Sequence, residues 1–130
     1  IARDITNDIS KGKKSKLSKI VEQKGQIKSK ALANAIKDND KVASGHISKS
    51  CETIGRVLAN VNNLLNLDAI ILGGGVIEAL ESFMLPKIKD SFYANSLKAT
   101  AEGVNLLATR LGDDAAIYGG IVLAEEFNKL

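Results

Sequence analysis

The sequence has 130 residues, of which 45% are hydrophobic and 25% charged, and its formal net charge is +3. These values are typical of one globular domain and exclude a disordered chain, which would combine few apolar residues with a large net charge. No apolar run approaches the about 20 residues that a membrane-spanning helix needs, and one cysteine and one histidine form neither an intramolecular disulfide nor a Cys/His zinc site.

The first fifty residues carry most of the positive charge. Residues 1–50 contain 12 Lys and Arg against 5 Asp and Glu, a net charge of +7, whereas the net charge of residues 51–130 is −4. A basic segment can bind nucleic acid, but all the aromatic residues lie in the acidic part, and stacking on single strands needs aromatic rings among the cations. We therefore favour solvated helix faces, with a nucleic-acid contact as the alternative.

Residues 1–38 are expected to form short helices joined by polar turns. The spacing of three isoleucines predicts a helix over residues 2–10, and a second short helix is expected to end near Gly25. Ser29 is the expected N-cap of a third helix over residues 30–37, because a serine hydroxyl can accept a hydrogen bond from a free backbone amide of the first turn.

The clearest helix is predicted over residues 41–65, with Asp40 as its N-cap. Apolar side chains recur there at intervals of four and three, and we expect them to form one buried stripe: Ile47, Cys51, Ile54, Leu58, Val61 and Leu65. Cys51 is interpreted as a packing residue because nothing nearby in sequence would lower its pKa. His46 has no neighbouring partner for catalysis or metal binding, so we expect neither role.

From residue 67 onward the pattern is that of an α/β protein. Residues 67–72 predict a strand buried on both faces, and residues 104–109 predict a second strand. The helix between them contains Pro86, as a kink or as the first residue of a second short helix. A final helix follows, with one apolar side. The order strand, helix, strand, helix predicts two parallel strands.

The strongest local motif is Gly73-Gly74-Gly75 followed by Val76, at the carboxyl end of the first predicted strand. Without Cβ atoms the backbone amides are open to a ligand, a helix N-terminus favours phosphate, and ligands of α/β sheets bind beyond the carboxyl ends of strands. The alternative is a tight turn with no ligand. A Rossmann fingerprint is excluded because Glu78 stands where it needs glycine, and no P-loop Gly-Lys-Ser/Thr is present.

The second motif is Gly112-Asp113-Asp114, at the start of the final helix. Two adjacent carboxylates could hold a metal ion or act as a base. An N-cap at Asp113, with Asp114 in the first turn, explains both residues through the helix dipole, and we favour that interpretation. We therefore predict no metal site and no catalytic residue in this chain.

Taken in order, these segments resemble the C-terminal portion of ROK-family proteins, which comprise bacterial sugar kinases, including glucokinases, and sugar-responsive transcriptional repressors. The resemblance covers essentially the whole chain and rests on Gly55, residues 58–60, residues 63–66, residues 70–76, residues 111–115, Gly119 and Gly120. It implies a helix-rich α/β fold with about two parallel strands, the second lobe of the actin-like, ribonuclease H-like ATPase architecture.

The resemblance also implies a site and partners. The residues that would lie at ATP, bound with Mg, are Gly73, Gly74, Gly75 and Val76, with Gly112 and Asp113 as weaker candidates. In an intact kinase of this family the lobes close on ATP–Mg and a hexose, and a catalytic aspartate deprotonates the sugar hydroxyl before γ-phosphoryl transfer. A cytoplasmic homo-oligomer, commonly a dimer, without a membrane partner is implied as well.

The chain departs from the family pattern in what it lacks. The N-terminal Asp-x-Gly-Gly-Thr phosphate loop, the catalytic Asn-Asp, the sugar-contacting Glu-x-x-x-Gly-His and the Cys-rich zinc motif have no counterpart. We therefore expect the back part of a larger two-lobed protein, inactive alone, with residues 1–66 as a helical segment and residues 67–130 as the nucleotide-side segment of one domain.

Three functions stay open. The favoured one is the ATP-side part of a sugar kinase. The alternative is the effector-binding or dimerising part of a repressor, whose DNA-binding helix-turn-helix would lie in preceding sequence. A helical α/β domain used only for oligomerisation is the third.

Overall fold

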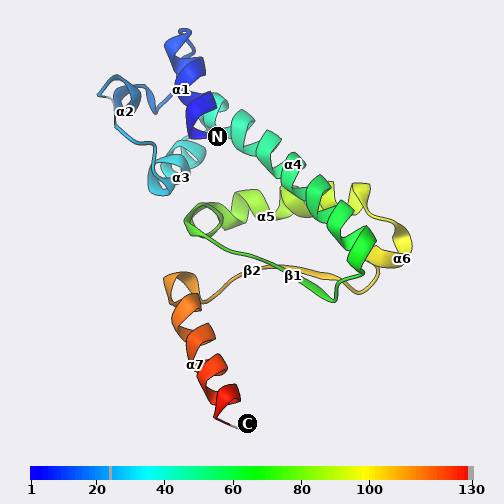
Figure 1. The fold of residues 1–130 in the computed structure, drawn as a ribbon. Coiled ribbons are helices and arrows are strands. Elements are labelled where there is room, and N and C mark those ends of the chain that lie inside the picture. Colours follow the sequence, from blue (N-terminus) through cyan, green and yellow to red (C-terminus); the bar gives the residue numbers. More distant parts are fainter. Residues whose placement is uncertain (24, 129–130) are drawn as a thin grey trace.

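The computed structural model describes residues 1–23 and 25–128, without the side chain of Asp113. Its elements are α1 (Ala2–Ser10), α2 (Ser18–Glu22), α3 (Ser29–Lys37), α4 (Lys41–Leu65), β1 (Ala69–Leu72), α5 (Gly75–Asn95), α6 (Lys98–Ala101), β2 (Asn105–Ala108), the 3₁₀ turn η1 (Gly112–Asp114) and α7 (Ala115–Phe127). Figure 1 shows α4 and α5 above the two strands, α1–α3 at one end of α4, and α7 extending away below. The helix-rich α/β prediction is confirmed.

The two strands are parallel, as predicted, and pair Ile70 with Leu106 and Ile71 with Leu107. Because side chains alternate along a strand, the first pair faces α5 and is buried, whereas Ile71 is 67% and Leu107 48% exposed on the opposite face. The prediction that β1 is buried on both faces is therefore wrong. Both long helices lie on one side of the sheet (Figure 1), and no described residue covers the other.

The long helix α4 has the bounds that the sequence predicts. Asp40 caps it, since Asp40 Oδ1 accepts a hydrogen bond from the Ala43 amide at 2.9 Å. At the other end Asn66 adopts the left-handed conformation, with φ at 48°, and ends the helix. The same Asp40 carboxylate also accepts from Ser15 Oγ at 2.8 Å and from the Lys16 amide, so it ties the loop before α2 to the start of α4.

The buried side of α4 differs from the predicted stripe in the second half of the helix. Its buried residues are Ala43, Ile47, Cys51, Gly55, Ala59 and Asn62. Leu58 is only half-buried, and Val61 and Leu65 are exposed. The physical reason is close packing against α5. A Cβ on Gly55 would lie 2.6 Å from the Ile88 carbonyl oxygen, so the small side of α4, and not its bulky side, faces α5.

The buried side of helix α5 consists of Leu80, Met84, Ile88 and Phe92, which recur at intervals of four and are all 3% exposed or less. Pro86 lies inside the helix, but the break in helical geometry is at Leu80, whose φ and ψ are −128° and 17°. The predicted interruption at Pro86 is therefore wrong: the helix continues through the proline, and its break lies six residues earlier.

The short helices mostly follow the sequence prediction. The helix α1 has the predicted bounds, and α2 ends shortly before Gly25. The predicted N-cap of α3 is wrong, because Ser29 is the first helical residue and the N-cap is Lys28, which makes no side-chain capping bond. The capping geometry belongs to the non-helical residue before the first turn, and in α3 that position is Lys28, whose side chain offers no acceptor.

The final helix α7 contacts the rest of the chain mainly through η1, and Figure 1 shows it standing clear of the sheet. Its N-cap is Asp114, which makes no side-chain capping bond, whereas the predicted capping role of Asp113 concerns a side chain outside the described part. The large apolar side chains of α7 are all more than half exposed: Ile117, Tyr118, Ile121, Val122, Leu123 and Phe127. Within the described residues, no helix is long and apolar enough to span a membrane.

Candidate functional site

The glycine turn lies where the sequence places it, between the end of β1 and the start of α5. Gly74 has φ at 102° and ψ at 153°, a conformation that side chains other than glycine rarely adopt. No atom lies within 4 Å of the position that a Cβ on Gly74 would occupy, and Gly73, Gly74 and Gly75 are all exposed. The turn therefore presents bare backbone to an open space.

The second predicted segment follows β2 and reaches the same end of the sheet. The Thr109 amide donates to the Leu72 carbonyl at 2.7 Å, and a Cβ on Gly73 would lie 3.2 Å from Thr109 Cγ2. Gly112, with φ at 52°, lies beside the first turn of α5, because a Cβ on it would be 4.0 Å from Glu78 Oε2. The structure thus brings both predicted segments together at the carboxyl ends of the parallel strands.

The residues predicted to bind a cofactor differ in their exposure to solvent. Val76, the second residue of α5, is 37% exposed, whereas Gly112 is half-buried. The side chain of Asp113 lies outside what the structure describes. The hydroxyl of Ser29 also lies near Gly75, although the sequence indicates Ser29 only as a helix cap. No local pattern links Ser29 to a turn more than forty residues away.

The start of α5 carries two opposing electrostatic features, the positive end of the helix dipole and a nearby carboxylate. The α5 N-terminus has no side-chain cap, so its first amides keep their hydrogen-bonding capacity and the positive end of the helix dipole. Glu78 is the acidic residue in the first turn of α5 and sets a negative charge at the rim. The described residues contain no group of three His, Cys, Asp or Glu side chains that could hold a metal ion.

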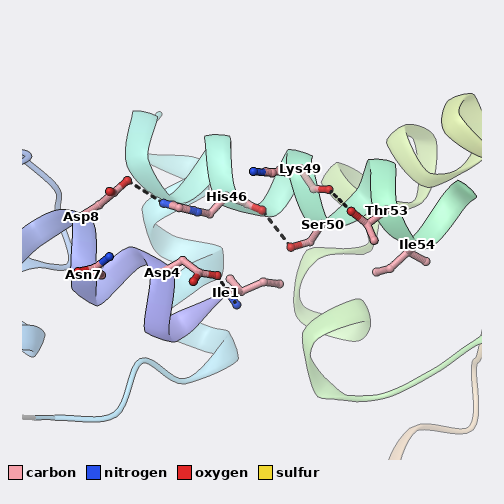
Figure 2. A pocket seen from close by; sticks show the side chains of 9 residues that line it. All are labelled: Ile1, Asp4, Asn7, Asp8, His46, Lys49, Ser50, Thr53 and Ile54. Atoms are coloured by element: carbon pink, nitrogen blue, oxygen red, sulfur yellow. Dashed lines mark hydrogen bonds and ion pairs between the residues drawn. The ribbon is translucent and has the colours of Figure 1, made fainter. Parts of the chain in front are cut away.

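A separate open hollow of about 670 Å³ lies between α1 and α4, and Figure 2 shows its lining. His46 Nε2 lies 2.8 Å from Asp8 Oδ2, and the same oxygen accepts from Lys13 Nζ at 2.7 Å. The Lys13 and His46 hydrogen bonds hold the pKa of Asp8 below its usual value. No sequence pattern indicates this pair, because the two residues are thirty-eight positions apart.

The hydroxyls of this hollow are used for helix structure. Ser50 Oγ donates to the His46 carbonyl at 3.0 Å, and Thr53 Oγ1 donates to the Lys49 carbonyl at 3.1 Å (Figure 2). Cys51 is buried in α4, and burial raises the pKa of its thiol. Among the described residues of this hollow, no nucleophile is hydrogen-bonded to a base, and the arrangement joins α1 to α4.

Comparison with known proteins agrees with this architecture. A "Glucokinase" from Halalkalibacterium halodurans is 32% identical over 120 residues, which are 92% of this chain and 36% of that protein. A proposed sugar kinase from Cytophaga hutchinsonii superposes on 94% of this chain and 40% of its own, with a TM-score of 0.78 and 21% identity. A ROK family transcriptional regulator, a homologue of the E. coli MLC protein, superposes on 82% of this chain and 26% of its own, with a TM-score of 0.70 and 25% identity.

These likenesses confirm the fold class as the helix-rich α/β architecture that ROK sugar kinases and regulators share, an actin-like ATPase fold. The chain spans about a third of the length of the glucokinase relative. The sequence model of the ROK family matches residues 8–127, nearly the whole sequence. The chain therefore belongs to the ROK family.

Proposed function

We propose that this chain is the ATP-side part of a ROK-family sugar kinase of the glucokinase type, which phosphorylates a hexose with ATP as the phosphoryl donor. The observation that carries the proposal is the glycine turn, bare, uncapped and open at the shared carboxyl end of two parallel strands. The glucokinase relative supports the reaction class, since it is similar over 92% of this chain.

In this proposal residues 67–130 hold the nucleotide and residues 1–66 support them. The backbone at Gly74 and Gly75 would lie against the phosphates, because there a Cβ would intrude between the amides and the ligand. Val76 would offer apolar contact at the start of α5, and Gly112 would close the same edge from the β2 side. Asp113 is the remaining member of the proposed site. Bound ATP supplies the phosphoryl group, with magnesium neutralising its charge.

The reacting groups for the sugar would come from elsewhere in a protein of the relatives' length. The sequence contains no Asp-x-Gly-Gly-Thr phosphate loop. The acidic residue beside the glycine turn is Glu78, in the first turn of α5. We accordingly propose that the chain binds nucleotide but does not phosphorylate sugar on its own.

The second candidate is the effector-binding or dimerising part of a ROK repressor. The specific observation in its favour is the structural likeness to a ROK family transcriptional regulator, at a TM-score of 0.70 and 25% identity. The coding sequence upstream of the Ile1 codon distinguishes the two. An Asp-x-Gly-Gly-Thr loop followed by an Asn-Asp pair supports the kinase, and a DNA-binding helix-turn-helix supports the repressor.

The nucleotide claim is tested by isothermal titration of Mg·ATP into three proteins: wild type, Gly74→Val and Gly45→Val. Valine at position 74 needs a backbone conformation that it rarely adopts and blocks the open space of the turn. Gly45 lies on an exposed side of α4, and no atom lies within 4 Å of the position that its Cβ would occupy, so its variant is the matched control. We expect saturable binding by wild type and Gly45→Val, and at least about 10-fold weaker binding by Gly74→Val. Equal affinity of all three proteins would contradict the proposal.

A further inference from the structure

The first residue of α3, Ser29, lies against the glycine turn although it is far from it in sequence. Ser29 Oγ is 3.9 Å from the position that a Cβ on Gly75 would occupy, which is ordinary van der Waals distance. Gly75 is the residue at which α5 begins, so this hydroxyl lies beside the start of α5. A group seated against the Gly75 backbone on this side would therefore also meet Ser29.

The hydroxyl of Ser29 is held in place by the packing of α3. Leu32 and Ala35, in the following turns of the helix, are 3% and 2% exposed and belong to the core. The Asp40 amide donates to the Ala35 carbonyl at 2.9 Å, which fixes the end of α3 to the start of α4. Ser29 itself is half-buried. It is thus part of a packed wall and not of a loose loop.

This hydroxyl is not used to build the helix on which it stands. The N-cap of α3 is Lys28, and no side chain makes the capping hydrogen bond. The neighbours Lys28 and Lys30 are both exposed and place positive charge on the same turn. A hydroxyl on a turn that also carries two cations is suited to an anionic oxygen, since hydrogen bonds to charged acceptors are the stronger ones.

We infer that Ser29 is a binding residue of the nucleotide site, and that Ser29 Oγ–H donates a hydrogen bond to a phosphate oxygen of the nucleotide held at Gly75. The inference rests on the proposed function, because it assigns a second wall to the same site. With it, the site comprises the glycine turn on one side and the first turn of α3 on the other.

The test compares the affinity for Mg·ATP of wild type, Ser29→Ala, Ser29→Thr and the control Ser82→Ala, again by isothermal titration. Ser82 is an exposed serine two turns further along α5, about 10 Å along the helix from Gly75. We expect Ser29→Ala to bind about 10-fold more weakly, because it loses one hydrogen bond to a charged group, whereas Ser29→Thr keeps the hydroxyl and stays within about 3-fold of wild type. Ser82→Ala should bind like wild type.

A second measurement guards against an indirect effect of the alanine. When Mn·ATP is titrated into ¹⁵N-labelled protein, the amide signals of Ser29 and Gly75 should broaden together and before that of Ser82. If wild type binds no Mg·ATP, both the proposed function and this inference fail. If wild type binds and Gly74→Val does not, but Ser29→Ala binds like wild type or the Ser29 amide is not broadened, the inference alone is overturned.

Discussion

Substituting Gly55 by alanine should force α4 and α5 apart. A Cβ at this position would lie 2.6 Å from the Ile88 carbonyl oxygen, 2.6 Å from Ser91 Cβ and 2.8 Å from the Phe92 amide nitrogen. Relief of the shortest contacts to an ordinary distance requires a separation of roughly 0.8 Å, and two of the three partners are backbone atoms that move only with the helix. Overpacking of this kind costs about 1–3 kcal/mol.

Alanine also favours the helix over glycine by about 0.5–1 kcal/mol, which offsets part of that cost. We expect a net loss of about 1–2 kcal/mol in the free energy of unfolding, read from urea titrations followed by far-UV circular dichroism. Gly45→Ala is the matched control in the same helix, because no atom lies within 4 Å of its Cβ position, and it should gain about 0.5–1 kcal/mol. If Gly55→Ala proves as stable as Gly45→Ala, the close packing of α4 on α5 is wrong.

Three other outcomes are expected. Asp40→Ala should lower the free energy of unfolding by about 1–2 kcal/mol, because it removes the N-cap bond to Ala43; an unchanged urea midpoint would contradict that role. Burial alone would raise the pKa of Asp40, but its hydrogen bonds outweigh burial, and the pKa of Asp8 is lowered by its partners as well. The stabilisation of the fold by these two carboxylates is therefore complete above their ordinary pKa of 3.8 and is lost as the pH falls below it. Below that pH, the free energy of unfolding of wild type should fall more steeply than that of Asp40→Asn. Parallel curves of unfolding free energy against pH would count against this. Finally, the open face of the sheet should make copies of the chain associate, and Ile71→Lys with Leu107→Lys should reduce the mass measured by light scattering at equal concentration; an unchanged mass would show that this face is not used.

The elements of the fold are predictable from the sequence where the signal is local. Asp40 and the apolar periodicity mark α4 correctly, because capping and helical spacing act within a few residues. The predicted buried side of its second half is wrong, since Gly55 and Ala59 are buried and the bulkier Leu58 is only half-buried. The periodicity of one helix cannot show how closely another helix approaches it.

Part of the candidate site is likewise predictable from local sequence, and part depends on how distant segments pack. The triple glycine after β1 predicts an open turn at the end of a strand, and Gly74 has the backbone geometry that only glycine adopts readily. The approach of Ser29 to this turn, and the pairing of Asp8 with His46, depend on how α3 and α1 pack on the rest of the chain. Such contacts between distant segments leave no pattern in either segment alone.

The central claim, that the glycine turn binds the nucleotide, is tested most directly by titrating Mg·ATP into the ¹⁵N-labelled chain and following its amide resonances. We predict saturable shifts at Gly73, Gly74, Gly75 and Gly112, with the α1–α4 hollow around His46 unaffected. Shifts confined to that hollow, or no saturable shift at the glycine turn, would contradict the claim.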